Sequence, residues 1–477
     1  MVIDDSKRHG ALIEARFENA QDTVDNKRLW ENAQLWNINY AAHQGVRWKL
    51  MGRAQYTYRN NSYAQGICNT LADDTIGAGP KLQITAPNQE AANRLENDWA
   101  EWSEEIGLAE KLWQARLRKV VDGESFLVEE TNDRLMHPVK LDVRCYDAAH
   151  FYSINQYPSE RDGRVYTDGI ILDKRDNPLF YEKQPYDLFS SQQYLNNYQP
   201  SEMIAGDFVY HLYQRTQSEQ YRGTPEIASV LGLFEELRRY TLAVIAAAET
   251  AADLAVVLAT NQPLDGECQP IVSSTSSDST DRAFDLVDIP RRSMMVAPEG
   301  WSPQQIRAEQ PTTTYDMFTD KIIREIARCL SMPFNIAAGD SSQYNYASGR
   351  LDHQTYHRKI DIERKYFERK LLNRLFRNWY RERQLSGAEM PRTGQIERIT
   401  WTWHAREHVD PLKEAQANAV LAAAGLLDYD RYWQEQNCSA DEVIRRQQRY
   451  MEARQEAGLG EPDYASTTDR RVAQTSN

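Results

Sequence analysis

The segment 331–350, SMPFNIAAGDSSQYNYASGR, constrains the fold more than any other part of the chain. Only Asp340 and Arg350 are charged in it, and Pro333 ends the preceding helical pattern because it lacks an amide donor. Upstream, apolar residues recur at the spacing that lines one helix face: Met317, Ile322, Ile323, Ile326 and Leu330. Downstream the same spacing joins Tyr356, Ile360, Phe367, Leu371, Leu375 and Trp379. The pattern therefore predicts a polar loop between two long helices, which is more typical of a moving part than of a catalytic site.

The composition is that of a soluble globular protein, and its charge restricts the function. The 477 residues have a net charge of −14, with 26% charged and 41% hydrophobic residues. The length favours about three domains. A conventional DNA-binding protein needs an excess of Lys and Arg to displace counterions from phosphates, and this chain has the opposite balance. We find no apolar run long enough for a membrane span or a signal peptide, so we expect the chain to stay in the cytoplasm.

Periodicity and turn signals divide the chain into regions. Helical spacing predicts helices over 60–75, 88–121, 225–253, 411–425 and 439–458. The Asp122-Gly123 pair indicates a turn into a strand at 125–130, and alternation continues to Tyr181. Strand-like segments at 254–260 and 291–298 flank a polar insert. The N-terminal part is therefore predicted to be mixed α and β, and the C-terminal part helical.

Patterns that would indicate an enzyme or a metal site are weak. Gly339 to Ser342 resembles the nucleophile block of some esterases, but it follows a helix and a proline instead of a strand. His353 with His357, and His404 with His408, have the spacing that zinc requires on one helix face, but no third ligand is evident. The five cysteines are scattered, which favours reduced thiols. We expect no cofactor and no metal. A cytoplasmic hydrolase or nucleic-acid-processing enzyme using residues 340–350 remains an alternative.

Four blocks of this sequence resemble the lambda-type portal proteins of tailed bacteriophages. In family order they are NNSYAQGICNTLADDTIGAGP at 60–80, YHLYQRTQSEQYRGTP at 210–225, REIARCLSMPF with GDSSQYNYASGR at 324–350, and DPLKEAQA at 410–417. The resemblance extends over roughly residues 53–457. It implies a predominantly helical α+β fold, with wing, stem, clip, tunnel loop and crown, that assembles as a ring.

The resemblance also implies a division of the chain into portal regions. They are 1–45, a mobile N-terminal arm; 46–224, a mixed α/β wing; 225–253, a stem helix; 254–310, the clip; 311–333, a second stem helix; 334–349, the tunnel loop; 350–400, a long wing helix and the following segment; 401–458, a helical crown; and 459–477, a disordered tail.

The function implied by the resemblance is structural, without enzymatic activity. A portal protein forms the DNA channel at one vertex of a phage head, through which DNA is packaged and ejected. The implied partners are further copies of the chain in a dodecamer, double-stranded DNA, terminase, head-tail connector proteins, and major capsid and scaffold or protease proteins, with no membrane. The expected location is the virion, after assembly in the host cytoplasm. Another virion adaptor component remains an alternative.

The channel-facing residues implied by the resemblance lie in the tunnel loop: Asp340, Ser341, Gln343, Asn345, Tyr346, Ser348 and Arg350. Acidic walls with few cations hold phosphates weakly, which suits a sliding duplex. Alternatively, Ser348 is only the N-cap of the following helix. The tract 358–383 has ten Lys or Arg against four acids and predicts a solvated helix face. If that tract faced the channel or a neighbouring subunit, it would instead pair with acids or slow DNA.

Overall fold

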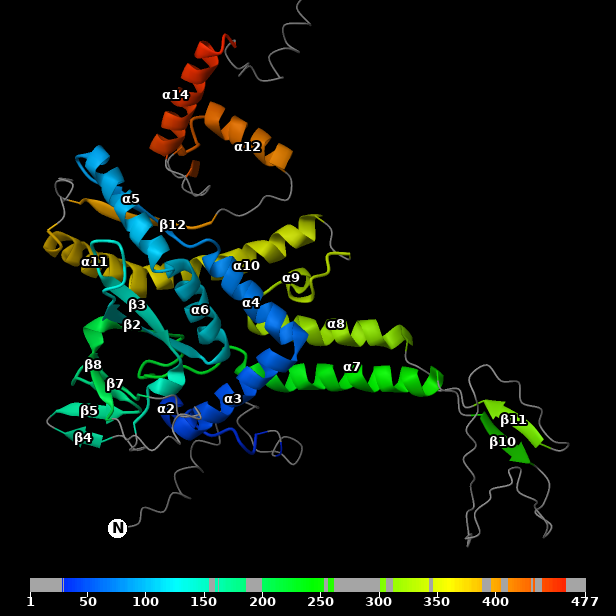
Figure 1. Ribbon diagram of the computed structural model, residues 1–477. Coiled ribbons are helices and arrows are strands. Elements are labelled where there is room, and N and C mark those ends of the chain that lie inside the picture. Colours follow the sequence, from blue (N-terminus) through cyan, green and yellow to red (C-terminus); the bar gives the residue numbers. More distant parts are fainter. Residues whose placement is uncertain are drawn as a thin grey trace, which may run out of the picture. The chain divides into compact units, whose positions relative to one another are not determined.

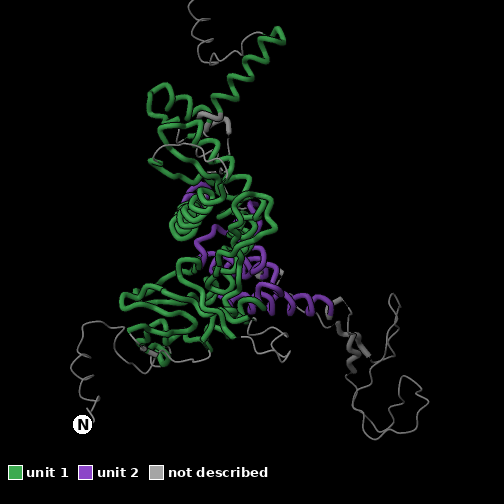
Figure 2. Tube along the Cα trace, turned by 60° about the vertical axis from the view of Figure 1, so that its left-hand side comes forward, with its two compact units in different colours: residues 1–56, 68–228, 357–477 green, residues 57–67, 229–356 purple. Residues whose placement is uncertain are grey.

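The computed structural model describes residues 28, 30–153, 159–161, 163–185, 200–252, 256–260, 301–305, 312–342, 346–387, 396–404, 411–429, 432–433 and 440–459. They divide into two compact units (Figure 2). The first comprises 1–56, 68–228 and 357–477, and the second comprises 57–67 and 229–356. The chain passes from one unit to the other within α3 (Gln44–Asn60), α4 (Ser62–Ile76), the 3-10 turn Ala228–Val230 and α10 (Tyr346–Phe367).

The first unit combines helices with three antiparallel sheets (Figure 1). Its helices, including two that continue into the second unit, are α2 (Ile38–Ala41), α3 (Gln44–Asn60), α4 (Ser62–Ile76), α5 (Gln89–Glu105), α6 (Leu108–Val121), α11 (Asn373–Leu385), α12 (Pro411–Ala423) and α14 (Ala440–Glu456). The sheets have the strand orders β1-β12, β3-β2-β9 and β4-β5-β6-β7-β8. Their strands are β1 (Lys81–Thr85), β2 (Glu124–Thr131), β3 (Leu141–Tyr146), β4 (Ser159–Arg161), β5 (Arg164–Thr167), β6 (Ile170–Leu172), β7 (Pro178–Lys183), β8 (Glu202–Ala205), β9 (Val209–Tyr213) and β12 (Arg398–Thr402).

The main core of this unit is built around tryptophans. Trp99 of α5 lies 5.3 Å from Trp379 of α11 and 5.5 Å from Trp401 of β12, measured between ring centroids, and all three are buried. The apolar spacing that predicts these helices is therefore the spacing that fills the core. Helix α6 packs on β2 and β3, which places it beside the central strand of the three-stranded sheet.

The predicted turn at Asp122-Gly123 is confirmed, and it requires glycine. Gly123 has φ +90°, and a Cβ at this position would lie 2.1 Å from the backbone carbon of Thr224. A Cβ at Gly223 would likewise lie 2.1 Å from the carbonyl oxygen of Gly123. The two backbones approach so closely that only glycine fits at either position.

Several helices and regions begin or end at residues other than those predicted. The helical segment 88–121 is two helices, because Gly107 adopts φ +63° between them. The helix expected from residue 225 begins at Leu231, after a short 3-10 turn. The expected N-terminal arm ends before residue 45, since Ile38 and Asn39 belong to α2 and Asn39 donates to the carbonyl of Glu219. Trp401, the first residue of the expected helical crown, belongs to the strand β12, which pairs with β1.

The second unit contains a pair of long helices, α7 (Leu231–Ala252) and α8 (Thr312–Cys329), that lie side by side (Figure 1). Tyr240 of α7 stacks on Tyr315 of α8 at a centroid distance of 5.5 Å. Between these helices in the chain, β10 (Val256–Thr260) pairs with β11 (Trp301–Gln305). The strand expected at 254–260 is thus confirmed, whereas the one expected at 291–298 lies outside the described residues.

The long helix after the polar segment is confirmed, and it contains an irregular turn. Helix α10 (Tyr346–Phe367) continues through a π-helical turn (Glu368–Leu372) into α11. Within the described part of the chain, no helix is both long and apolar enough to cross a membrane. Cys68, Cys145 and Cys329 are free thiols, as expected, and the other two cysteines lie outside the described residues.

Candidate functional site

The polar segment between α8 and α10 is more ordered than the sequence predicts. Helix α8 ends at Cys329, before Pro333, and Ser331 adopts φ 54°. A short helix, α9 (Phe334–Ala338), follows with Pro333 as its N-cap residue. Phe334 and Ala337 are buried, and this burial explains why part of the expected loop is helical.

Of the seven predicted channel residues, the structure places three with their side chains. Asp340, Ser341 and Arg350 are exposed. Gln343 and Asn345 lie outside the described residues, and for Tyr346 and Ser348 only the backbone is described. Because α10 begins at Tyr346, Ser348 lies inside the helix, so the alternative that it is the N-cap is wrong. Asp340, Ser341 and Arg350 do not line the hollow beside this segment.

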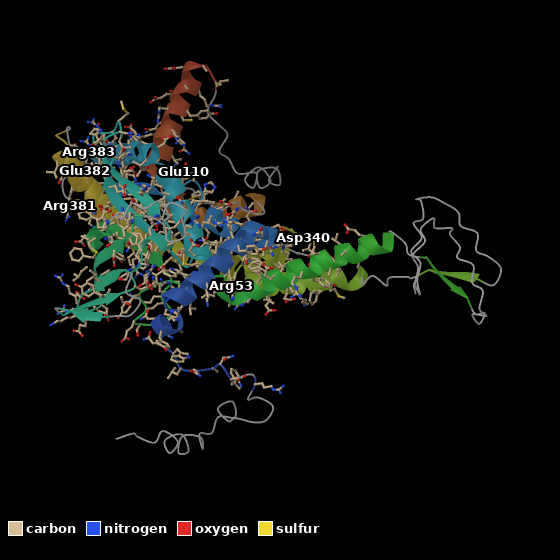
Figure 3. All side chains as sticks on the ribbon, turned by 60° about the horizontal axis from the view of Figure 1, so that its bottom comes forward. Arg53, Glu110, Asp340, Arg381, Glu382 and Arg383 are labelled. Carbon is tan, nitrogen blue, oxygen red and sulfur yellow. The ribbon has the colours of Figure 1, made fainter. Side chains whose placement is uncertain are left out.

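Asp340 is the only acidic residue of the segment, and it follows α9 directly (Figure 3). Its amide donates to the carbonyl of Asn335 at 3.1 Å, and its Oδ1 accepts the amide of Ser342 at 2.8 Å. Hydrogen bonds from Ser342 to the carboxylate, first the one from its backbone and then the one from its side chain, lower the pKa of Asp340 below its ordinary value. Each copy of the chain therefore presents one fixed negative charge here at neutral pH.

A surface hollow of about 290 Å³ adjoins this segment within the second unit. Arg324, Arg328 and Asp352 line it together with Phe334, and the Arg324 guanidinium lies 4.5 Å from the Phe334 ring centroid. The charged residues of the lining are thus two cations and one acid, and the rest of it includes the apolar Ala327, Met332 and Pro333.

The predicted enzyme and zinc patterns find no supporting geometry in the described residues. The Gly339 to Ser342 segment follows a helix, and the Asp340 carboxylate is engaged by the Ser342 amide. His353 Nε2 lies 3.0 Å from Asn335 Nδ2. No group of His, Cys, Asp or Glu in the described part of the chain is arranged to hold a metal ion.

The charge pattern predicts that the basic tract 358–383 is a solvated helix face. In the structure, several of its cations instead bind groups elsewhere in the first unit. Arg364 donates to the carbonyl of Thr75 at 2.9 Å, and Arg374 donates to the carbonyl of Asp207 at 2.9 Å. Arg383 is buried and its Nε donates to Asp98 at 2.5 Å. These cations connect α10 and α11 to distant parts of the first unit, whereas Arg381 beside them is exposed (Figure 3).

The first unit contains two buried ion networks that the sequence analysis does not predict. In one, Glu124 accepts hydrogen bonds from Arg222 and from Gly223 N, and lies 3.0 Å from His211 Nε2. Burial alone would raise the pKa of Glu124, but the Arg222 guanidinium, the His211 hydrogen bond and Arg47 hold it well below its usual range. Arg222 lies inside the block at 210–225, so that block was the available signal.

The second network surrounds Arg116, which is fully buried on α6. Arg116 donates to both carboxylate oxygens of Glu226, at 3.0 and 3.2 Å, and Lys119 donates to Glu363 at 2.6 Å. Although burial opposes ionisation, Arg116 and Lys119 lower the pKa of Glu226 to about 2. Both networks connect distant parts of the first unit, and none of their residues lines the hollow beside the polar segment.

Comparison with solved structures gives distant matches to gene transfer agent particles. A chain from the virion of a native gene transfer agent particle matches with 12% identity and a TM-score of 0.42, over 87% of this chain and 99% of that one. A chain from the neck of the native particle, computed with C12 symmetry, matches with 13% identity and a TM-score of 0.42, over 82% and 92%. None of the curated proteins searched matches this chain.

The sequence itself matches a family model over most of its length. Residues 30–364 match the model for phage portal proteins of the lambda family. The match includes α7, α8, the polar segment and three of the four blocks on which the resemblance rests. It stops inside α10, so the later helices are not covered. The chain belongs to the lambda family of phage portal proteins.

Proposed function

We propose that this portal protein forms the ring-shaped DNA channel at one vertex of a phage head, through which DNA is packaged and ejected. Family membership over residues 30–364 is the observation that supports the proposal. The ring is a dodecamer that docks terminase during packaging and head-tail connectors afterwards, and it meets the capsid and scaffold or protease proteins in the virion. Assembly takes place in the host cytoplasm. These partners follow from the family resemblance.

The region assignment is part of the proposal. Helices α7 and α8 form the stem, and the β10–β11 pair belongs to the clip. The tunnel segment comprises α9 and the residues up to the start of α10. The exposed Asp340, Ser341 and Arg350 support this role, because they are polar side chains at the surface of a segment joining two long helices.

The electrostatics of the segment suit a sliding duplex. A wall that captured each phosphate with a cation would release counterions and hold the DNA in place. The chain has a net charge of −14, and the segment 331–350 presents one carboxylate and one guanidinium. Its serine, asparagine and tyrosine side chains offer neutral hydrogen bonds, which are weaker than charged ones. The channel therefore guides DNA without tight binding.

Imaging of the assembled protein by negative-stain microscopy, with its native mass, tests this function. We expect an annulus with an axial hole wide enough for a DNA duplex. A stable monomer under assembly conditions, or a closed particle without a hole, would contradict the proposal.

A pair of substitutions separates the portal from the hydrolase alternative. Asp340→Ala and Ser341→Ala should leave the oligomer intact and alter DNA packaging, with no turnover lost. If either substitution abolished a hydrolytic activity of the purified protein, the segment would be a catalytic site and the portal account of it would be wrong.

A further inference from the structure

Helix α3 exposes a basic face in an acidic protein. Its sequence, QGVRWKLMGRAQYTYRN, contains no Asp or Glu. Lys49, Arg53 and Tyr56 are exposed and recur at the spacing of one helix face, while Met51 and Ala54 are buried on the other side. A Cβ at Gly52, on the same exposed face, would meet nothing within 4 Å. Within the described residues neither Lys49 nor Arg53 has an ion-pair partner, so these two positive charges are unpaired there.

The exposed face around the junction of α5 and α6 has the opposite charge. Glu101, Glu104 and Glu110 are exposed there, and none of the three has an ion-pair partner among the described residues. The buried face of α5 holds Trp99 and Trp102, so the glutamates point away from the core. The two unpaired positive charges on α3 are thus complementary to three unpaired negative charges on the α5–α6 face.

Each charged face also includes one large exposed side chain. Tyr56 on α3 is 53% exposed, and Met136 is 90% exposed. The Met136 amide donates to Glu105 at the end of α5, which keeps Met136 beside the acidic face. A tyrosine ring and a thioether form favourable contacts with each other.

The two faces do not meet within one copy. Helices α3 and α5 lie apart in the first unit (Figure 1), and Arg53 and Glu110 are well separated (Figure 3). Since the described residues of one copy leave these charges unpaired, another copy of the chain can pair them.

We propose that the α3 face of one copy docks on the α5–α6 face of the next copy in the ring. Lys49 and Arg53 pair with Glu101, Glu104 and Glu110 of that copy, and Tyr56 packs beside its Met136. The contact is head-to-tail, because two different faces meet, and such contacts generate rings when the rotation closes. The inference rests on the proposed ring and names one of its subunit contacts.

Charge reversal tests the pairing. The variants are Lys49→Glu with Arg53→Glu, Glu101→Lys with Glu104→Lys, and a third with all four substitutions. The control, Arg377→Glu with Arg381→Glu, makes the same charge change on exposed residues of α11. Circular dichroism checks folding, and analytical ultracentrifugation at low and high salt measures the concentration at which rings form.

We expect each double variant alone to need about tenfold more protein to assemble, with the difference reduced by salt. The fourfold variant should regain assembly, and so should an equimolar mixture of the two double variants, because each then supplies the face that the other lacks. The control should assemble like the wild type.

Three results would overturn the inference. One is wild-type assembly by both double variants, and another is folded double variants that neither the mixture nor the fourfold variant rescues. Normal rings from the α3 variant with a loss of DNA packaging would mean that α3 meets DNA or another partner, which also overturns it. If the wild-type protein formed no ring, the proposed function would already have failed, so the two failures are distinguishable.

Discussion

Arg222 donates from its Nε to both carboxylate oxygens of Glu124, at 3.0 and 2.9 Å, in the interior of the first unit. Glu124 is completely buried, and Arg222 is 5% exposed. Arg222 also donates to the carbonyl of Phe151 at 2.9 Å. The pair thereby joins the start of β2, the segment after β9 and the chain before the five-stranded sheet.

Replacing Glu124→Gln should destabilise the protein strongly. The substitution removes the nearest carboxylate of the buried Arg222 and leaves it only the more distant pair with Asp168, at 3.4 Å. Breaking a buried ion pair in this way costs about 3–5 kcal/mol. Urea unfolding followed by tryptophan fluorescence measures the loss. The control is Glu90→Gln, which removes the exposed pair with Arg94 and should cost less than about 1 kcal/mol. Equal effects of the two substitutions would show that the buried network contributes little.

Acidification should destabilise the protein through His211. Burial lowers the pKa of His211 from 6.5 to about 4, despite the nearby Glu124 carboxylate. The unfolded chain therefore takes up a proton below pH 6.5 that the folded chain does not bind until about pH 4, so stability decreases as the pH is lowered through that window. The lowered pKa of Glu124 extends the loss to more acidic pH, whereas the pKa of Asp122, which burial raises to about 6, opposes it.

The variant His211→Gln isolates this contribution. It should flatten the dependence of the urea midpoint on pH between 6.5 and 4, even if it lowers the midpoint at every pH. A pH profile with the wild-type slope in this window would rule out His211 as its cause.

Gly123→Ala should prevent stable folding or lower the midpoint severely. The added Cβ would overlap the backbone of Thr224, and φ +90° is itself strained for alanine. Gly66→Ala is a matched control, because Gly66 lies inside α4 with nothing within 4 Å of the new Cβ. This control should stabilise the protein by about 0.5–1 kcal/mol. Similar midpoints for the two variants would contradict the close approach.

Asp340→Lys should slow DNA packaging without affecting ring assembly. The substitution replaces the one carboxylate of the segment with a cation in every copy, and each cation can hold a phosphate. The defect should be larger at low salt, where counterion release contributes more. Packaging rates of the variant, with Asp340→Asn as a milder control, give the measurement. A lysine variant that packages at the wild-type rate at all salt concentrations would place Asp340 away from DNA.

The sequence predicts the apolar framework better than the polar one. The positions of Leu371, Leu375 and Trp379 follow from helical spacing, and the structure buries all three. The spacing does not reveal the π-helical turn or the break at Gly107, because both depend on local backbone geometry.

Two cations of the basic tract show why the polar contacts could not be predicted from the sequence. Arg364 and Arg383 belong to a tract whose charge pattern is typical of a solvated face. Their acceptors, the carbonyl of Thr75 and the carboxylate of Asp98, lie far away in the sequence and become neighbours only in the folded chain. Likewise, the short helix α9 depends on the burial of Phe334, which sequence spacing alone did not indicate.

Cryo-electron microscopy of the assembled wild-type protein tests the central claim most directly. The account predicts a ring of identical subunits around an open axis, with residues 339–350 of every copy at the inner wall and Arg350 near the path of the duplex. A reconstruction with these residues on the outer rim, or an assembly without an open axis, would contradict it.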